Sequence, residues 1–167
     1  MTDLIILASL LPGPKHGYQL KHEAGLILGQ ETLHNNLVYP LLRRFTEAGW
    51  VTKKTVPGER GHERHQYALT ALGRRTLVQK LSEYSDSDAR SWEAFLTRVG
   101  LFQVLDPDAR DQILTGRSAH LQRTGEHLKG IETRFRLDSY ARETVQFLRS
   151  QIEAELNWIQ HLRKISK

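Results

Sequence analysis

Apolar residues recur every three to four positions along most of the chain, the spacing that places them on one face of an α-helix. In residues 36–48 this face carries Val38, Leu41, Leu42 and Phe45. Proline and glycine interrupt the pattern at residues 12–14, 29 and 49, where helices are expected to end. The pattern predicts helices over residues 4–11, 16–28, 36–48, 70–81, 92–105, 109–137 and 139–165.

The period changes between the third and fourth predicted helices. Residues 51–56 and 65–69 are rich in β-forming side chains, and a turn-rich stretch with Pro57, Gly58 and Gly61 separates them. We therefore predict a two-stranded hairpin here. The later segment 82–91 has almost no apolar side chains, which is typical of a linker. The chain is thus expected to contain a domain at residues 1–81, a linker at 82–91 and a helical region at 92–167.

Three helices followed by a hairpin are the winged helix-turn-helix arrangement, in which the third helix can enter the DNA major groove. The predicted fold is mainly α with a small β-hairpin: an N-terminal winged helix-turn-helix domain and a C-terminal helical dimerisation region. Polar side chains near the start of the third helix suit base edges, and basic side chains on the helix and hairpin suit phosphates. These candidate DNA-binding residues are His34, Asn35, Asn36, Arg43, Arg44, Lys53, Arg60, His62 and Arg64.

The charge distribution supports an anionic partner for the first half. The chain has 167 residues and a net charge of +5. Residues 1–81 contain eleven bases and six acids, whereas the remainder contains thirteen of each. This asymmetry predicts an anionic partner for the first half and self-association of the neutral second half. A solvated basic face is the alternative interpretation.

Composition also bears on the compartment. The absence of cysteine fits a reducing environment. The apolar run at residues 4–11 is too short to span a bilayer and has no basic signal-peptide region before it. We expect a soluble, cytoplasmic protein without a membrane partner.

Three motifs in the first half share their order and residues with a known family. They are His-Gly-Tyr-Gln-Leu at residues 16–20, Val-Tyr-Pro-Leu-Leu-Arg-Arg-Phe at 38–45 with Glu-Ala-Gly-Trp-Val at 47–51, and Tyr-Ala-Leu-Thr-Ala-Leu-Gly-Arg at 67–74. This half resembles the PadR-type transcriptional regulators, and the second half is similar in layout to the longer members, whose helices form the dimer. The resemblance implies a homodimeric repressor, and it maps the family's tyrosine near the DNA backbone onto Tyr39.

One region departs from the family pattern. The family's recognition helix usually opens with small residues, where this chain has His34, Asn36 and Leu37. The departure leaves the expected fold intact, but the family then offers no guide to the DNA sequence that is read.

The last predicted helix carries an apolar stripe longer than a winged domain needs to cover, which favours an interface. A two-fold dimer would read a roughly palindromic operator. Packing within one subunit is the alternative for part of this stripe. The candidate interface residues are Val145, Leu148, Ile152, Leu156 and Ile159.

A small apolar or aromatic effector is a further hypothesis. Aromatic residues follow the predicted linker, and another lies in the last helix, so folding back would gather their faces between the winged domain and the C-terminal helices. Such ligands are a feature of some PadR relatives. A plain core role explains the same residues equally well. The candidate effector-binding residues are Trp92, Phe95, Phe102 and Trp158.

Other classes of function find less support. The sequence has no G-x-G-x-x-G, P-loop or G-x-S-x-G motif, so we expect no enzyme and no cofactor. Eight histidines without cysteine or a repeated ligand spacing predict no metal site. The alternative to a DNA-binding regulator is a helical interaction protein whose winged domain binds protein or RNA. Steep weakening of binding by salt would distinguish DNA from an apolar protein partner.

Overall fold

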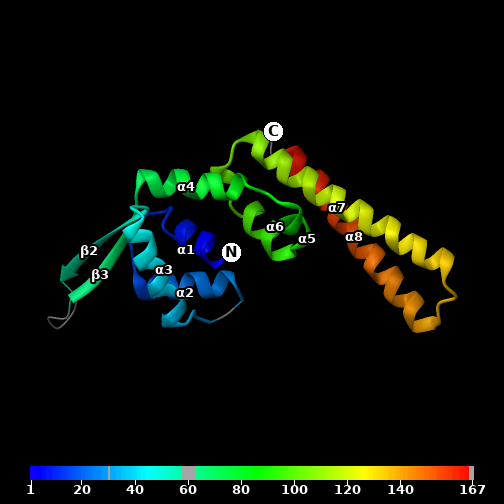
Figure 1. Ribbon diagram of the computed structural model, residues 1–167, viewed down its shortest axis with the longest axis horizontal. Helices are drawn as coiled ribbons and strands as arrows, with labels where there is room; N and C mark the ends of the chain where they lie inside the picture. Colours follow the sequence, from blue (N-terminus) through cyan, green and yellow to red (C-terminus); the bar gives the residue numbers. More distant parts are fainter. Residues whose placement is uncertain (30, 58–62, 166–167) are drawn as a thin grey trace. The chain divides into compact units, whose positions relative to one another are not determined.

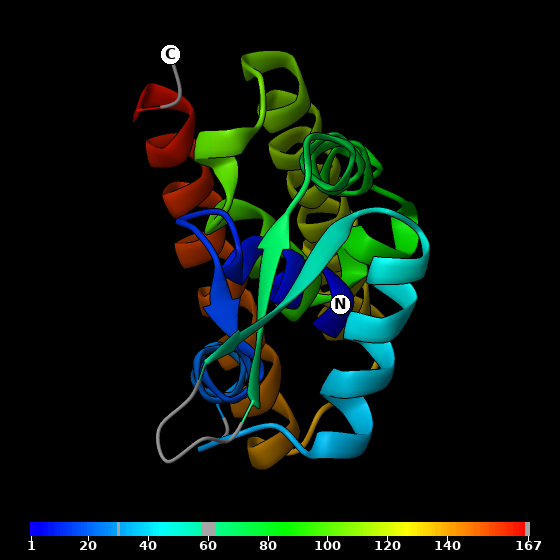
Figure 2. The same ribbon diagram turned by 90° about the vertical axis from the view of Figure 1, so that its left-hand side faces the viewer.

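Residues Met1–Glu83 form the first of two units in the computed structural model, which describes residues 1–29, 31–57 and 63–165. The unit contains a three-stranded antiparallel sheet in the order β1-β3-β2, whose strands are seen lengthwise at the front of Figure 2. Its elements are α1 (Thr2–Ser9), β1 (Lys15–His16), α2 (Gly17–Ile27), α3 (Asn35–Glu47), β2 (Val51–Pro57), β3 (Glu63–Leu69) and α4 (Ala71–Ser82), labelled in Figure 1.

The core of this unit forms around α1, which packs against both α2 and α4. Leu4, Ile5, Ile6 and Leu7 are all buried, because a helix enclosed by neighbours is apolar all round. The amphipathic α3 instead buries one face only. Strand β1 was not predicted, since two residues have no periodic pattern and become a strand only through their pairing with β3.

Residues Tyr84–Lys167 form the second unit. Its two long helices, α7 and α8, run side by side as an antiparallel pair (Figure 1). Ile113, Leu114 and Leu121 of α7 are buried together with Val145 and Ile159 of α8. The elements are α5 (Asp86–Arg90), α6 (Trp92–Val99), the 3-10 helix η2 (Phe102–Val104), α7 (Pro107–Arg134) and α8 (Ser139–Ile165). The predicted fold class, mainly α with a small β-hairpin, is confirmed.

The boundary between the two units falls within the predicted linker at residues 82–91, but the segment is not without secondary structure. This segment contains α5, and Ala89 within it is buried. The Ser85 hydroxyl accepts a hydrogen bond from the Asp88 N–H at 3.1 Å, and the Asp88 carboxylate accepts one from the Ser85 N–H at 3.0 Å. This reciprocal cap stabilises the first turn of a helix. Polar composition suggested a linker, but the Ser-x-x-Asp spacing is a helix-start signal.

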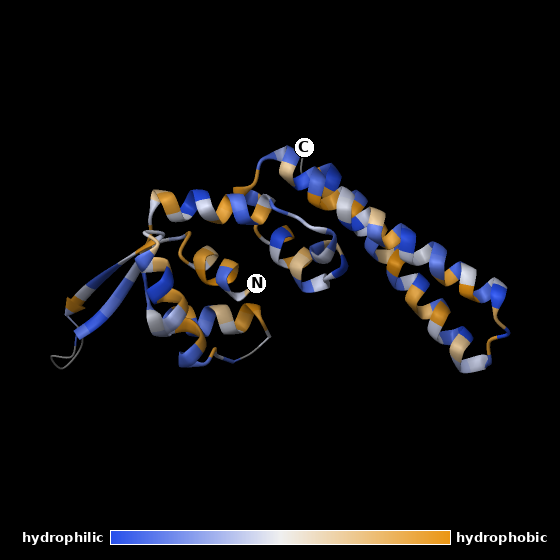
Figure 3. Cartoon of the chain, in the orientation of Figure 1, coloured by the Kyte–Doolittle hydropathy of each residue, from blue (hydrophilic) through white to orange (hydrophobic). Residues whose placement is uncertain are grey.

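Hydropathy alternates along both long helices, as the orange and blue bands of Figure 3 show. Among the helices of the described residues, none has a stretch that is both long and apolar enough to cross a membrane.

Candidate nucleic-acid interface

Helix α3 is held by one buried face and presents the other to solvent. Val38, Leu42 and Phe45 are fully buried. Asn36, Tyr39 and Arg43 follow one another at three- and four-residue spacing, so they lie along one exposed face. The predicted residues His34, Asn35 and Arg44 are also exposed on this helix or at its N-cap. All the candidate DNA-binding residues that the sequence placed on this helix are therefore exposed.

Tyr39 lies against the start of α2. A Cβ atom on Gly17 would be 2.9 Å from Cε1 of the Tyr39 ring and 3.1 Å from its hydroxyl oxygen. Glycine at position 17 therefore makes room for the tyrosine, which explains part of the His-Gly-Tyr motif. Tyr39 is 42% exposed, so it stays accessible to a ligand beside Gly17.

A hollow of about 640 Å³ surrounds this tyrosine within the first unit. Tyr18 lines it, is 58% exposed and stacks on His16 with a centroid separation of 6.0 Å. Tyr67 lies at its inner side, where burial, followed by the nearby Tyr39, raises the pKa of the Tyr67 hydroxyl. Sequence analysis did not select Tyr18 as a site residue, although its place beside the motif glycine was a usable signal.

The hairpin does not bring its predicted basic residues onto one face. Lys53 of β2 is paired with Tyr67 of β3, whereas Arg64 of β3 is paired with Val56 of β2, three positions after Lys53. Because side chains alternate along strands and paired residues share a face, Lys53 and Arg64 lie on opposite faces. Lys54, a further basic residue of the hairpin, shares the face of Arg64. Arg60 and His62 lie outside the described residues.

The basic residues of α3 are available for a partner. Arg43 makes an ion pair with Glu47 at 3.8 Å, but its side chain is 79% exposed. Exposed pairs of this kind contribute little free energy, so a phosphate can displace the carboxylate. The guanidinium of Arg44 lies 5.7 Å from the centroid of the Phe45 ring.

The end of β3 is joined to the end of α3 by a small hydrogen-bond cluster. The Thr70 hydroxyl donates to the Gly49 carbonyl at 2.7 Å and accepts from the Gly73 N–H at 2.9 Å, which caps α4. The Thr70 N–H donates to the Trp50 carbonyl at 2.9 Å. Together these bonds hold the base of the hairpin against the C-terminal end of the candidate recognition helix.

In the second unit, three of the four predicted effector-binding aromatics form one cluster. Ring centroids of Trp92, Phe95 and Trp158 lie 5.8 to 6.1 Å apart. Phe95 is fully buried, while Trp92 is 43% exposed. The fourth, Phe102, is buried and lies outside this cluster of rings. The cluster therefore has a core side and an open side.

The open side is a groove of about 640 Å³, here named the tryptophan groove. All its lining residues belong to the second unit, whereas the sequence placed the effector between the two domains. The groove is lined by Trp92, Arg117, Gln151, Ala154, Glu155 and Trp158.

Arg117 is the central polar residue of this groove. Its guanidinium donates to both carboxylate oxygens of Glu155, at 2.6 and 3.0 Å, and to the Ala89 carbonyl at 2.7 Å. It also lies 5.7 Å from the Trp92 centroid and 5.6 Å from that of Phe95. Sequence analysis missed this role, although an arginine at a seam position of an amphipathic helix is a signal for a buried ion pair.

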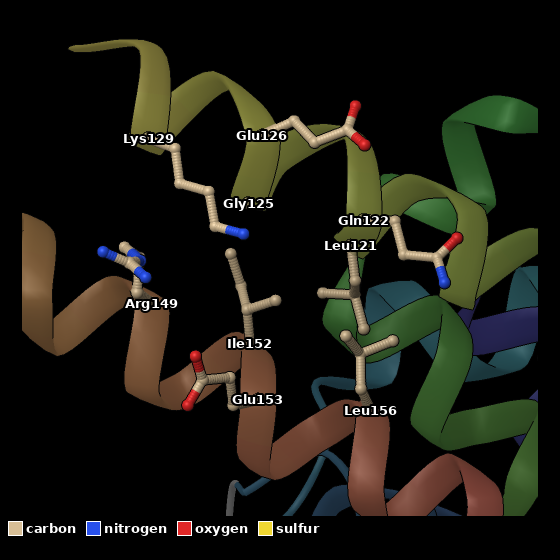
Figure 4. A pocket seen from close by; sticks show the side chains of 9 residues that line it. All are labelled: Leu121, Gln122, Gly125, Glu126, Lys129, Arg149, Ile152, Glu153 and Leu156. Atoms are coloured by element: carbon tan, nitrogen blue, oxygen red, sulfur yellow. The ribbon is translucent and has the colours of Figure 1, made fainter. Parts of the chain in front are cut away.

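The predicted dimer stripe is used largely within one subunit. Val145 and Ile159 are buried, because the apolar stripe of α7 already covers them. Ile152 and Leu156 are partly buried and face Leu121 across a hollow of about 190 Å³ between α7 and α8 (Figure 4). Only Leu148 is classed as exposed, at 39%. Of the five candidate interface residues, Val145 and Ile159 therefore follow the alternative interpretation, packing within one subunit.

The arrangement of the first unit is that of a winged helix-turn-helix domain, a class that binds DNA through its third helix. Residues 6–79 match the model of the transcriptional regulator PadR-like family. Through this domain the chain belongs to the PadR-like family, whose members are DNA-binding transcriptional regulators and not enzymes. No curated protein sequence matches the chain.

Several solved structures are similar. A transcriptional regulator of Thermoplasma acidophilum is 31% identical, with 47% of this chain and 74% of that chain covered and a TM-score of 0.44. Bacillus subtilis PadR, solved in complex with operator DNA, is 18% identical over 99% of this chain and 98% of its own, with a TM-score of 0.48. A PadR family regulator of Eggerthella lenta is 27% identical over 47% and 66%, with a TM-score of 0.41.

Proposed function

We propose that the protein is a homodimeric repressor that binds a roughly palindromic operator through α3 and the hairpin. The observation that carries this proposal is the exposed row Asn36, Tyr39 and Arg43 on a helix whose opposite face is core. An asparagine amide can pair with adenine in the major groove, while hydroxyl and guanidinium groups donate to phosphates. The row thus contains one base-reading group and two groups that position the helix on the backbone.

The test is a salt series on a duplex obtained by selecting bound DNA from a random pool. Replacing Arg43 and Arg44 with alanine should weaken binding to every sequence and flatten the plot of log affinity against log salt by about one unit per lost phosphate contact. Asn36→Ala should change the preferred sequence and leave that slope unchanged. Arg134 and Arg136, both exposed in the second unit, supply a charge-matched control pair. Unchanged affinity of the Arg43 and Arg44 double variant at all salt concentrations would refute this placement.

We also propose that a flat apolar molecule in the tryptophan groove releases the repressor from DNA. The exposed face of Trp92 and the half-buried Trp158 offer aromatic contact area, and the Arg117–Glu155 pair offers polar groups at the groove wall. An effector acts only through its different affinity for the two states, and a tenfold change in DNA affinity needs about 1.4 kcal/mol of coupling.

Tryptophan fluorescence tests the effector proposal. Phenolic and polycyclic compounds are titrated with and without the selected duplex, and Trp92→Phe serves as the variant that removes one wall of the groove. A regulating ligand should quench the parent protein and bind more weakly when DNA is present. Equal affinity in both conditions would show binding without regulation, and no quenching by any compound would remove the proposal.

A further inference from the structure

Helix α8 has a second row of residues that the rest of the described chain leaves largely uncovered. These residues alternate four and three positions apart, which is the spacing of a coiled-coil seam. Tyr140 is 84% exposed, Phe147 60% and Ile165 66%. The row, here named the outer seam, consists of Tyr140, Thr144, Phe147, Gln151, Ala154, Trp158, His161 and Ile165.

The outer seam is distinct from the stripe that packs on α7. Val145, Ile152 and Ile159 mark the inner stripe, and a rotation of 100° per residue puts the outer seam on a different side of the helix. Thr144, Gln151 and His161 interrupt its apolar character, which is why the sequence pattern alone did not reveal it. Seven of its eight members are exposed, and Trp158 is partly buried by the aromatic cluster.

We propose that α8 of a second copy docks antiparallel on the outer seam, and that Phe147 of each copy fills the tryptophan groove of the other. An antiparallel pairing centred between Gln151 and Ala154 sets every seam residue opposite another seam residue. Phe147 meets Trp158 of the partner, Tyr140 meets Ile165, and Thr144 meets His161. Outside the central layer, where Gln151 meets Ala154, apolar residues face apolar ones and polar residues face polar ones. The seam is therefore largely complementary to itself, as an isologous interface requires.

The tryptophan groove is shaped to receive such a side chain. Ala154 lies between Gln151 and Trp158 along the seam, and its small side chain leaves the groove open beside the Trp92 and Trp158 rings. In coiled coils, each seam side chain enters a hole formed by residues of the facing helix. Phe147 is the exposed aromatic residue that the antiparallel pairing carries to this position.

Charge complementarity selects the antiparallel direction. Glu143 and Lys164 flank the outer seam on the same side, both are exposed, and neither forms an ion pair among the described residues. Antiparallel pairing places Glu143 next to Lys164 of the partner at both ends of the interface. Parallel pairing would leave the two charges about 30 Å apart, given a rise of about 1.5 Å per residue.

This inference rests on the proposed homodimer and adds a link to the proposed effector. A flat molecule that enters the tryptophan groove must displace the partner's Phe147. Effector binding and the arrangement of the two subunits are then coupled through one site, by mutual exclusion.

Cysteine cross-linking tests the direction and register without any DNA. The chain has no cysteine, so Thr144→Cys and His161→Cys each introduce the only thiol. In the proposed dimer, two copies of Cys at position 144 lie about 25 Å apart along the helix, as do two at position 161, which is too far for a disulfide. Co-expression of the two variants should give a covalent dimer on oxidation, and either variant alone should not.

Each other outcome contradicts the inference in a recognisable way. Cross-linking of Thr144→Cys with itself would show a parallel pair. No cross-link in the mixture, while light scattering still reports a dimer, would overturn the register and leave the dimeric repressor standing. A dilute monomer in the unmodified protein would remove this inference and the dimer together, whereas failure of the DNA salt series alone would leave it untouched.

Phe147→Ala supplies the second arm. It should raise the dimer dissociation constant at least tenfold, because the symmetric interface loses two aromatic side chains, one from each copy. Phe135→Ala is the matched control, since Phe135 is 63% exposed and lies off the outer seam. Equal dimer affinity for Phe147→Ala and the parent would refute the role of Phe147. Glu143→Lys should also weaken the dimer, and combination with Lys164→Glu should restore it.

Discussion

At the scale of single residues, Gly73 shows why a short motif can be demanding. A Cβ atom at this position would lie 2.0 Å from the Trp50 carbonyl oxygen, which is backbone and cannot rotate away. The Thr70 hydroxyl donates to the Trp50 carbonyl and accepts from the Gly73 N–H, so it joins the start of β2 to the start of α4. In the Leu-Thr-x-x-Gly sequence, the threonine therefore caps α4 and the glycine lets α4 approach the Trp50 carbonyl closely. Both features hold the hairpin against the end of α3.

Gly73→Ala should destabilise the first unit by about 3 kcal/mol, since overpacking against backbone forces the capped turn apart. Urea unfolding followed by circular dichroism measures the change. Gly130→Ala is the matched control, because a Cβ there meets nothing within 4 Å. Equal unfolding midpoints for the two variants would show that α4 can move away from Trp50 at little cost.

Tyr84 is a second residue with a measurable consequence. Its hydroxyl is buried without a hydrogen-bond partner among the described residues, and the Arg98 guanidinium lies 5.0 Å from its ring centroid. Burial raises the pKa of Tyr84 from its ordinary value of 10.0 to about 12, although Arg117 and Arg98 act in the opposite direction. The unfolded chain therefore loses this proton at a lower pH than the folded chain.

Tyr84→Phe should leave stability at neutral pH unchanged or higher by about 1 kcal/mol, because it removes an unpaired buried hydroxyl. Above pH 10 the parent should lose the stability that depends on keeping Tyr84 protonated, with the loss complete near pH 12, and the variant should not show this component. Unfolding measured between pH 8 and 12 tests the difference. Tyr140→Phe, at an 84% exposed site, should match the parent across the range.

At the scale of elements, α7 and α8 fit together imperfectly. Gly125 contributes no side chain opposite Ile152, and the space between them is part of the hollow in Figure 4, with Lys129, Arg149 and Glu153 at its border. A Cβ on Gly125 would lie 3.8 Å from the Ile152 side chain, an ordinary van der Waals distance. The pair therefore has room for one methyl group.

Gly125→Ala should stabilise the second unit by about 1 kcal/mol, because alanine favours the helix and makes a new contact with Ile152. Gly130→Ala should gain only the stabilisation that comes from the higher helix propensity of alanine, since its Cβ meets no neighbour within 4 Å. The difference between the two variants, measured as thermal unfolding midpoints, isolates the packing contribution. A lower unfolding midpoint for Gly125→Ala than for the parent would mean that the added methyl group does not fit between α7 and α8.

At the scale of the whole molecule, the positive charge and the candidate DNA interface belong to one unit. Residues Met1–Glu83 have their own core, formed by the helices α1 to α4 with the sheet. If recognition needs two such units joined by α8, one unit alone makes about half of the phosphate contacts.

The fragment Met1–Glu83 should therefore fold as a monomer and bind the selected duplex with about half the salt slope of the full chain. Its affinity should also be far lower, because the second half-site no longer benefits from linkage. The fragment with Arg43→Ala and Arg44→Ala is the control for nonspecific binding. A fragment that matches the full chain in slope and affinity would show that dimerisation is not part of DNA recognition.

Much of this molecule follows from local pattern. The apolar spacing of Val38, Leu42 and Phe45 decides which face of α3 is buried, and hence that Asn36, Tyr39 and Arg43 are exposed. The change of period after Gly49 indicates the hairpin, and Thr70 starts the next helix as expected of a cap. These features depend on neighbours a few positions away, so the sequence alone was enough to predict the fold class and which residues of α3 are exposed.

Tertiary structure decided which surface each apolar residue meets. Periodicity showed that α8 is amphipathic, but packing on α7 took Val145 and Ile159 and left Tyr140 and Phe147 outside. Contacts between distant segments decided three further features. They are the packing of Tyr39 beside Gly17, the ion pair of Arg117 with Glu155, and the strand pairing that puts Lys53 and Arg64 on opposite faces of the hairpin. The physical reason is that a hydrophobic or charged side chain specifies the kind of partner it needs, while only the folded chain determines which partner is within reach.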